Sequence, residues 1–174
     1  IADLPSALHN SILAGKAGDY PRSAQQLAEV FLGSDLGRRS RTSPRAGREW
    51  EFIADVGGTL VRGSIDLWFE ENGDIYVVDY KTDRKPDADA YRPQLALYAL
   101  ALERALGKRP VGAYLHFLRP DIVVEVPIDQ AALDSAQSLI GQLGAAQNSL
   151  EFDLREGVHC HSCQYYKTLC PAQA

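Results

Sequence analysis

Apolar positions along the chain recur with two different periods, which divide it into predicted helices and strands. From Ser23 to Gly33, apolar residues recur every three or four positions, which indicates an amphipathic helix with a serine N-cap. Short apolar or alternating runs, typical of strands, occupy residues 49–56, 59–70, 75–81, 110–118 and 122–126. Two more helices are predicted at residues 89–106 and 129–146, and Gly107 is expected to end the first.

The segments between these elements contain turn and loop signals. Gly57-Gly58 and Asn72-Gly73 are suited to tight turns between consecutive strands. A polar, arginine-rich stretch from residue 34 to about Gly47 is predicted to be a loop. The order helix, three strands, helix, two strands, helix predicts an α/β domain.

Length and composition narrow the class of protein. Of 174 residues, 45% are hydrophobic, which suffices for one core, so residues 1–174 are predicted to form a single domain with a cysteine-bearing tail at 157–174. No apolar run approaches the roughly 18 residues of a membrane span, so we expect a cytoplasmic protein with no membrane partner. The chain begins at Ile1 and contains no methionine, which predicts a fragment of a longer polypeptide.

The net charge of −5 argues against a protein that is basic over its whole surface. A local basic patch is nevertheless present within the arginine-rich stretch. Its candidate nucleic-acid-binding residues are Arg38, Arg39, Arg41 and Arg45, and Arg48 follows closely. Such a patch could contact phosphates, and the alternative is that it is a solvated loop.

Two acidic residues and a lysine lie on neighbouring predicted strands. Asp79 and Lys81 are two apart, so their side chains point to the same face of a strand, and Asp66 lies on the strand before. Two carboxylates can hold a hard cation such as Mg²⁺, and we expect them within about 6 Å of each other so that they can share it. A lysine beside such a site can orient or deprotonate water. The alternative is a β-hairpin with solvated charges.

Three motifs in order resemble those of the RecB-type nucleases of the PD-(D/E)XK superfamily. They are G-x-x-D from Gly63 to Asp66, V-D-Y-K-T from Val78 to Thr82, and Q-x-x-x-Y from Gln94 to Tyr98. This group includes the nuclease domains of RecB, AddA and AddB and CRISPR-associated exonucleases. The resemblance implies a restriction-endonuclease-like core, with a mixed central β-sheet flanked by helices, and Mg²⁺- or Mn²⁺-dependent cleavage of DNA. It further implies an exonuclease acting on single-stranded DNA ends in repair or recombination, with a helicase in cis or in trans.

The resemblance also implies roles for individual residues. Asp66, Asp79 and the backbone carbonyl of Tyr80 would bind the metal, and Lys81 would act on the attacking water or on the charge that develops at phosphorus. Gln94 and Tyr98, four apart on a helix, would support the lysine and the DNA.

Two upstream residues are candidates for further positions of the family pattern. His9 is the candidate for the family's N-terminal histidine, although Ser6 stands where a glycine usually precedes it. Glu49 resembles the acid of an E-x-x-F strand that precedes G-x-x-D in these nucleases. It is either a structural acid or a residue near the metal.

The chain's only cysteines, Cys160, Cys163 and Cys170, form C-x2-C-x6-C near the C-terminus. Clustered thiols in a cytosolic protein indicate a metal more often than a disulfide. The segment resembles the tail that binds a [4Fe–4S] cluster in AddB-like nucleases, which requires a fourth cysteine that this chain lacks. The sulfur atoms are then expected to face a common centre. The alternatives are a Zn²⁺ site completed by His159 or His161, and three thiols with no metal.

Two other kinds of function remain open. One is a catalytically inactive nuclease fold that binds DNA or acts as a scaffold in a helicase complex, although the intact set of Asp66, Asp79 and Lys81 argues against it. The other is a structural metal-binding module whose function resides in the cysteine segment.

Overall fold

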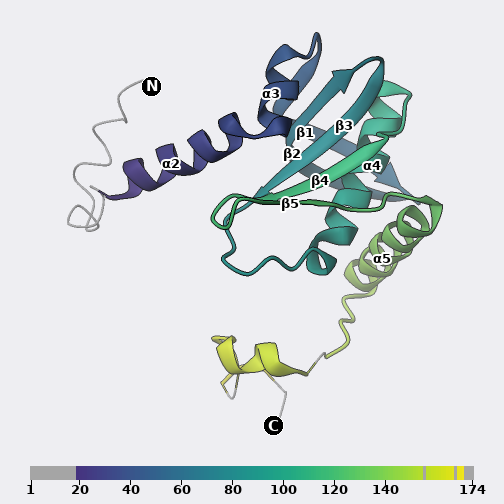
Figure 1. The fold of residues 1–174 in the computed structure, drawn as a ribbon. Coiled ribbons are helices and arrows are strands. Elements are labelled where there is room, and N and C mark those ends of the chain that lie inside the picture. Colours follow the sequence, from purple (N-terminus) through teal and green to yellow (C-terminus); the bar gives the residue numbers. More distant parts are fainter. Residues whose placement is uncertain (1–18, 155, 167, 171–174) are drawn as a thin grey trace, which may run out of the picture.

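Figure 1 shows the computed structural model of the chain, which describes residues 19–154, 156–166 and 168–170. Two helices come first, α2 (Asp19–Gly33) and α3 (Asp35–Thr42). The sheet and its covering elements follow: β1 (Ala46–Val56), β2 (Thr59–Glu71), β3 (Asp74–Lys81), the 3₁₀ turn η2 (Asp89–Tyr91), α4 (Arg92–Leu106), β4 (Gly112–Phe117), β5 (Ile122–Glu125), α5 (Gln130–Ser149) and the 3₁₀ turn η3 (Val158–Ser162).

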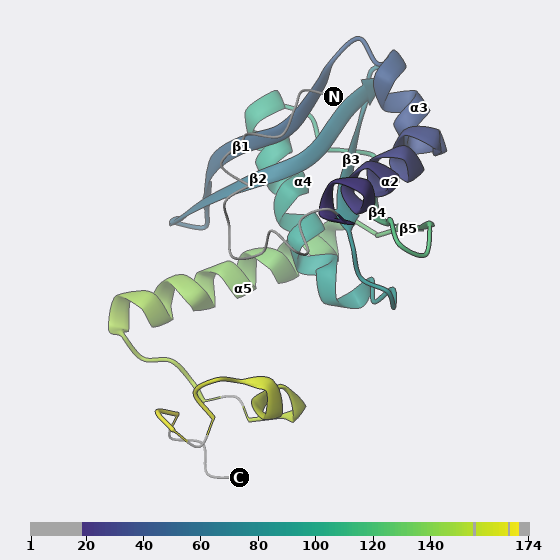
Figure 2. The same cartoon turned by 90° about the vertical axis from the view of Figure 1, so that its left-hand side faces the viewer.

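The sheet is mixed, as the sequence predicts. Its strands lie in the order β1-β2-β3-β4-β5, and every neighbouring pair is antiparallel except β3 and β4. The parallel pair is joined by the crossover through α4. In Figure 2, α4 lies on one side of β3, whereas α2 and α3 lie on the other. The sheet is therefore a layer between two groups of helices.

Two hydrophobic cores lie on the two faces of the sheet. The larger core is formed by one face of β1 to β4 with α4 and α5, and it includes the fully buried Val77, Leu95 and Leu133. The smaller core joins Leu36 of α3 to the opposite face of β2 and β3, with Phe31 at its border. Alternation of side chains along β3 thus supplies both cores from one strand.

The arginine-rich stretch is mostly helical, which corrects the prediction of a loop. Ser34 caps α3, because its hydroxyl accepts a hydrogen bond from the Gly37 backbone N–H at 3.0 Å. Gly37 then packs directly against the preceding helix, where a Cβ atom would lie 2.0 Å from the Phe31 carbonyl oxygen. Gly37 stands at the position where a glutamate usually completes a capping box, and glycine has low helix propensity. For these two reasons the sequence does not predict the helix.

The other predicted elements are present with shifted ends. The first helix begins at Asp19 rather than at Ser23, because Pro21 falls in its first turn, where a missing N–H does no harm. The first strand begins at Ala46 rather than at Glu49, and the last long helix continues to Ser149. Within the described residues, no helix combines the length and apolar character that crossing a membrane requires.

The first testable prediction concerns the cap of α3. Replacing Ser34 with Ala leaves the Gly37 N–H without its side-chain acceptor, so the free energy of unfolding should fall by about 1 kcal/mol in urea titrations. Ser135→Ala in α5 is the matched control, because Ser135 is exposed and an alanine inside a helix does not destabilise it. Equal stability of the two variants would show that Ser34 does not cap α3.

Candidate active site

The two predicted acidic residues meet where β2 and β3 separate. The antiparallel register pairs Leu67 with Val78, so the next position along places Asp66 opposite Asp79. Side chains opposite each other in such a pair have Cβ atoms about 4.5–5.5 Å apart. Asp66 also accepts a hydrogen bond from the Tyr80 backbone N–H through Oδ2 at 2.8 Å. This arrangement supports the expectation that the two carboxylates can share a cation.

A break in β1 lies beside Asp66. The register pairs Arg48 with Leu67 and Trp50 with Ile65, which places Glu49 opposite Asp66. Glu49 has a φ of 46°, a left-handed conformation that is uncommon for a residue other than glycine. No regular pair forms between Glu49 and Asp66 in this ladder.

The break changes which face the side chains of β2 occupy. Ile65 belongs to the larger core and Leu67 to the smaller one, although residues two apart on a regular strand share a face. Asp66 lies at the change of face. Its carboxylate therefore reaches the end of β3, where it binds the Tyr80 backbone N–H, and it is not part of either core.

Lys81 is held by two partners at the end of β3. Its Nζ atom lies 2.7 Å from Oδ2 of Asp79 and donates a hydrogen bond to Oε1 of Gln94 at 2.9 Å. The Gln94 amide in turn donates to Oδ1 of Asp79 at 3.2 Å and to the Tyr98 hydroxyl at 2.7 Å. Because its oxygen faces an ammonium and its nitrogen faces a carboxylate, Gln94 has a single favourable orientation. The structure thus joins four of the predicted site residues in one network.

A second set of contacts, made by aromatic packing, supports the Tyr98 ring. The Tyr98 ring packs edge-on against Phe52, with centroids 6.1 Å apart. Phe52 in turn lies across Gly63, where a Cβ atom would be 2.6 Å from the ring. The glycine of the G-x-x-D motif therefore makes room for the aromatic ring that supports Tyr98, Gln94 and, through them, Lys81.

Tyr91 is a site residue that the motifs do not indicate. The Lys81 Nζ atom lies 4.0 Å from the centroid of the Tyr91 ring, which is a cation–π geometry. The Tyr91 hydroxyl donates a hydrogen bond to Oδ2 of Asp83 at 3.0 Å. The sequence signal for this contact is weak, since it consists only of an aromatic residue one helical turn before Gln94.

Burial determines the acid–base properties of the site. Burial raises the pKa of Asp79, the nearby charge of Asp66 raises it further, and the contact with Lys81 lowers it, so the net direction is upward. Burial also raises the pKa of Tyr98 to about 12. The Tyr98 hydroxyl therefore remains protonated at neutral pH.

The donor set fits a hard divalent cation. The Oδ2 atom of Asp79 is buried and lies 2.7 Å from the Lys81 ammonium, its close polar neighbour among the described residues. Within the described residues, no three side chains of His, Cys, Asp or Glu are grouped to hold a metal ion. A cation here would have carboxylate ligands from Asp66 and Asp79, with the Tyr80 carbonyl and water completing its shell. Mg²⁺ commonly keeps several waters when it is bound by one or two carboxylates.

His9, the candidate for the family's N-terminal histidine, lies outside the described residues.

The predicted basic patch is largely neutralised by acidic partners. The distances from guanidinium nitrogen to carboxylate oxygen are 2.8 Å for Arg38 and Asp35 and 2.8 Å for Arg39 and Glu71. The corresponding distance for Arg45 and Glu70 is 4.0 Å. Arg39 also lies over the rings of Phe69 and Tyr76, so its role is structural. Arg41 is the one of the four predicted residues without an acidic partner in the described part of the chain, and its Nη1 donates to the Leu32 carbonyl at 2.7 Å.

The cysteine segment does not form a ligand cluster. Cys160, Cys163 and Cys170 form no disulfide, and these described thiols do not gather with one another or with His159 or His161 into a metal-binding group. The expected convergence of the three sulfur atoms is therefore absent from this structure, as is the alternative zinc geometry.

Comparisons with known proteins agree with this geometry. A sequence profile of the PD-(D/E)XK nuclease superfamily matches residues 4–171, and the chain belongs to that family. An ATP-dependent helicase/nuclease protein of Clostridium kluyveri is 31% identical over 55% of this chain. Its counterpart in Desulforudis audaxviator is 38% identical over 53%. The match covers 9% of the length of each of these relatives.

Solved structures show the same fold. A protein from Eubacterium rectale, assigned as an exonuclease, superposes with a TM-score of 0.56 and 10% identity over 97% of this chain and 73% of its own. The crystal structure of SSO0001 gives a TM-score of 0.54 and 21% identity over 95% and 78%. The resemblance to RecB-type nucleases and the restriction-endonuclease-like fold are both confirmed, and the comparisons support nuclease function.

A second testable prediction follows from the packing of Gly63. In Gly63→Ala the added methyl group must displace the Phe52 ring, and such overpacking lowers the free energy of unfolding by about 1–3 kcal/mol. Gly141→Ala in α5 is the control, because nothing lies within 4 Å of its added Cβ atom and the substitution favours the helix. Urea unfolding of both variants checks the prediction, which fails if Gly63→Ala is as stable as the unaltered chain.

A third prediction concerns the pH dependence of metal binding. A proton and a divalent cation compete for Asp79, and because its pKa is raised, the proton is retained at a pH where an ordinary aspartate, with a pKa of about 3.9, has lost it. Mn²⁺ affinity should therefore fall on acidification at a pH above the range in which ordinary aspartates titrate. Calorimetric titration with Mn²⁺ at several pH values measures this. A fall that begins only in the ordinary aspartate range would contradict it.

Proposed function

We propose that this chain is the nuclease domain of a longer helicase–nuclease and that it hydrolyses DNA phosphodiester bonds with Mg²⁺ or Mn²⁺. The observation that carries the proposal is the convergence of two acids and one lysine: the buried Asp79 contacts the Lys81 ammonium at 2.7 Å, and Asp66 lies opposite Asp79 where β2 and β3 separate. Buried charges are unfavourable unless they are paired. Two carboxylates face one ammonium here, so a bound divalent cation would meet an excess of acidic groups.

The residues divide the chemistry between them. The bound metal would lower the pKa of a coordinated water and neutralise charge on the scissile phosphate. Asp66 and Asp79 would position it, and Lys81 would orient the attacking water or contact the phosphate as negative charge develops there. Gln94 holds Lys81 in place in this arrangement, and Tyr98 holds Gln94. The lysine therefore needs little reorganisation when substrate binds.

The names of the relatives support a proposal for the substrate and the larger assembly. The matched proteins are named as ATP-dependent helicase/nucleases. A helicase delivers separated strands, so we propose single-stranded DNA ends as the substrate, exonucleolytic cutting in cytoplasmic repair or recombination, and a helicase in cis or in trans as the partner. An inactive DNA-binding or scaffolding domain is the alternative. It gains no support from a site that holds a lysine against a buried carboxylate.

The cysteine segment belongs to the same proposal at the level of the longer protein. A [4Fe–4S] cluster needs four thiolates, and this chain supplies Cys160, Cys163 and Cys170. We propose that the fourth comes from polypeptide outside this chain and that its arrival draws the three sulfur atoms together. Metal-bound loops of this kind gain their order from the ligand bonds themselves.

The fourth prediction tests catalysis directly. Lys81→Ala should lower the rate of Mg²⁺-dependent cleavage of single-stranded DNA by about 10²–10⁴, the usual cost of losing a proton-transfer group, and Asp79→Ala should abolish metal-dependent cleavage. Lys108→Ala is the matched control, because Lys108 pairs with Asp74 at the opposite end of β3. Gel analysis of a labelled oligonucleotide gives the rates, and full activity in Lys81→Ala would remove the lysine from the mechanism.

A further inference from the structure

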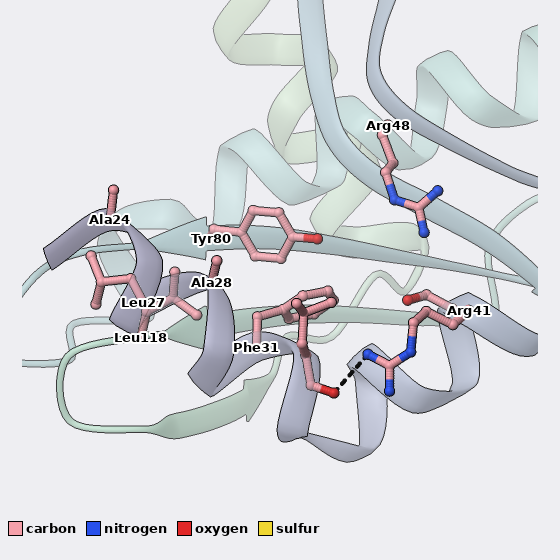
Figure 3. A pocket seen from close by; sticks show the side chains of 10 residues that line it. Ala24, Leu27, Ala28, Phe31, Arg41, Arg48, Tyr80 and Leu118 are labelled. Carbon is pink, nitrogen blue, oxygen red and sulfur yellow. Dashed lines mark hydrogen bonds between the residues drawn. The ribbon is translucent and has the colours of Figure 1, made fainter. Parts of the chain in front are cut away.

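A cavity of about 420 Å³ lies on the face of the sheet opposite α4. One wall is a face of α2 that includes Leu27 and Phe31, and Tyr80 of β3 and Leu118 complete the apolar lining. Arg41 and Arg48 provide its charged edge. Its volume falls in the range of roughly 300–1,000 Å³ that small-molecule sites occupy. Figure 3 shows the Tyr80 hydroxyl pointing toward the side where the two arginines lie.

This cavity and the candidate active site share Tyr80. The Tyr80 backbone N–H binds the Asp66 carboxylate, and its side chain lines the cavity. Asp79 and Lys81 lie on either side of it in the chain, and their side chains belong to the opposite face of the strand. The cavity and the candidate active site thus lie on opposite faces of the sheet at the same end of β3, and an adjoining nucleotide would reach the cavity around the edge where β2 and β3 no longer pair.

Arg48 has no partner in the described part of the structure. Its side chain is exposed and forms no hydrogen bond or ion pair with any described residue. Its charge does act on the Tyr80 hydroxyl, whose pKa it lowers against the upward effect of burial. Arg41 is oriented by its hydrogen bond to the Leu32 carbonyl (Figure 3). Guanidinium groups that have no acidic partner among the described residues, at the edge of a cavity, are suited to binding phosphate, which arginine binds in bidentate fashion.

The apolar part of the cavity suits a base. Phe31 packs edge-on against Tyr80 with ring centroids 4.6 Å apart, and one face of α2 continues the apolar surface. Proteins that bind single-stranded nucleic acid without sequence preference combine such aromatic surfaces for the bases with a cationic path for the backbone. Both parts are present here within one cavity.

We propose that this cavity binds one nucleotide of single-stranded DNA beside the scissile phosphate, with its base against Phe31 and Tyr80 and its phosphate on Arg48 and Arg41. The inference rests on the proposed function, since it assigns the position of the substrate strand relative to Asp66 and Asp79. It makes Arg48 and Phe31 substrate-binding residues that none of the three sequence motifs contains.

The test separates the phosphate contact from the base contact. Binding of a short fluorescein-labelled oligodeoxythymidylate is measured by anisotropy in EDTA at several salt concentrations. Arg48→Ala should weaken binding and reduce the slope of log affinity against log salt by about 0.7, the value for one phosphate contact on a single strand. Phe31→Leu should weaken binding about fivefold or more without changing the slope, and it should not weaken binding of a matched abasic chain.

Arg62→Ala is the matched control. Arg62 is an exposed arginine that pairs with Glu51 in the β1–β2 hairpin at 3.4 Å and lies outside the cavity. The proposal is overturned if Arg48→Ala and Arg62→Ala have equal affinities and slopes, or if Phe31→Leu weakens the abasic chain as much as the normal one. Arg48 is exposed, so its variant decides the matter even if Phe31→Leu fails to fold.

Failure of the proposed function would be visible separately. Mg²⁺-dependent cleavage of single-stranded DNA by the unaltered chain tests the nuclease, and the binding series in EDTA tests the cavity. A chain that binds through Arg48 but does not cleave contradicts the nuclease proposal alone. A chain that cleaves while Arg48→Ala behaves as Arg62→Ala contradicts the cavity proposal alone.

Discussion

The contact between the buried carboxylate of Asp79 and the ammonium of Lys81 is the interaction on which the site depends. Only 2% of the Asp79 side chain and 15% of the Lys81 side chain are exposed. A buried ion pair is seldom a source of net stability, because desolvation offsets the attraction. The fold instead surrounds this pair with supporting contacts from Gln94 and Tyr98. Asp66 adds a second carboxylate beside this pair, so the site has more acidic than basic groups and is suited to binding a further positive charge.

The geometry around this pair requires the strands to deviate from regular pairing. A regular ladder through Glu49 and Asp66 would assign Asp66 to one face of the sheet and would hold its neighbours in a strict alternation. The left-handed Glu49 breaks that alternation, and Asp66 instead binds the Tyr80 backbone. Strained backbone of this kind persists only where surrounding contacts over-determine it. Here the aromatic packing of Trp50 against Trp68, with centroids 6.3 Å apart, and of Phe52 against Tyr98 fixes β1 on the far side of the break.

Local patterns in the sequence predict the elements of this fold but not the contacts between them. The strand carrying Asp79 and Lys81 is evident because an apolar run places two charges on one face. The helix α3 is concealed because Gly37 packs against Phe31, a tertiary reason for a residue of low helix propensity. Arg39 illustrates the same limit. The sequence predicts that it contacts DNA, but in the fold it pairs with Glu71, which lies 32 residues away in the chain.

The site residues differ in the same way in how far the sequence predicts them. Asp66, Lys81, Gln94 and Tyr98 lie in motifs. The Lys81–Tyr91 contact and the absence of an acidic partner for Arg48 among the described residues depend on how separate elements pack. Positive φ at Glu49 is likewise unpredictable, since nothing about a glutamate in a β run favours a left-handed backbone.

The alternation of β3 has a consequence for how a substrate strand can approach. Asp79 and Lys81 face the layer that contains α4, whereas Tyr80 faces the layer that contains α2, so three consecutive residues serve both sides of the sheet. Regular pairing of β2 with β3 ends at Leu67, and at Asp66 the two strands are linked by the hydrogen bond from the Tyr80 N–H to the carboxylate. A substrate strand that used both the candidate active site and the cavity would have to pass around this edge of the sheet. A flexible single strand can do so far more readily than a duplex, with its persistence length of about 150 base pairs, and this supports the proposed single-stranded substrate.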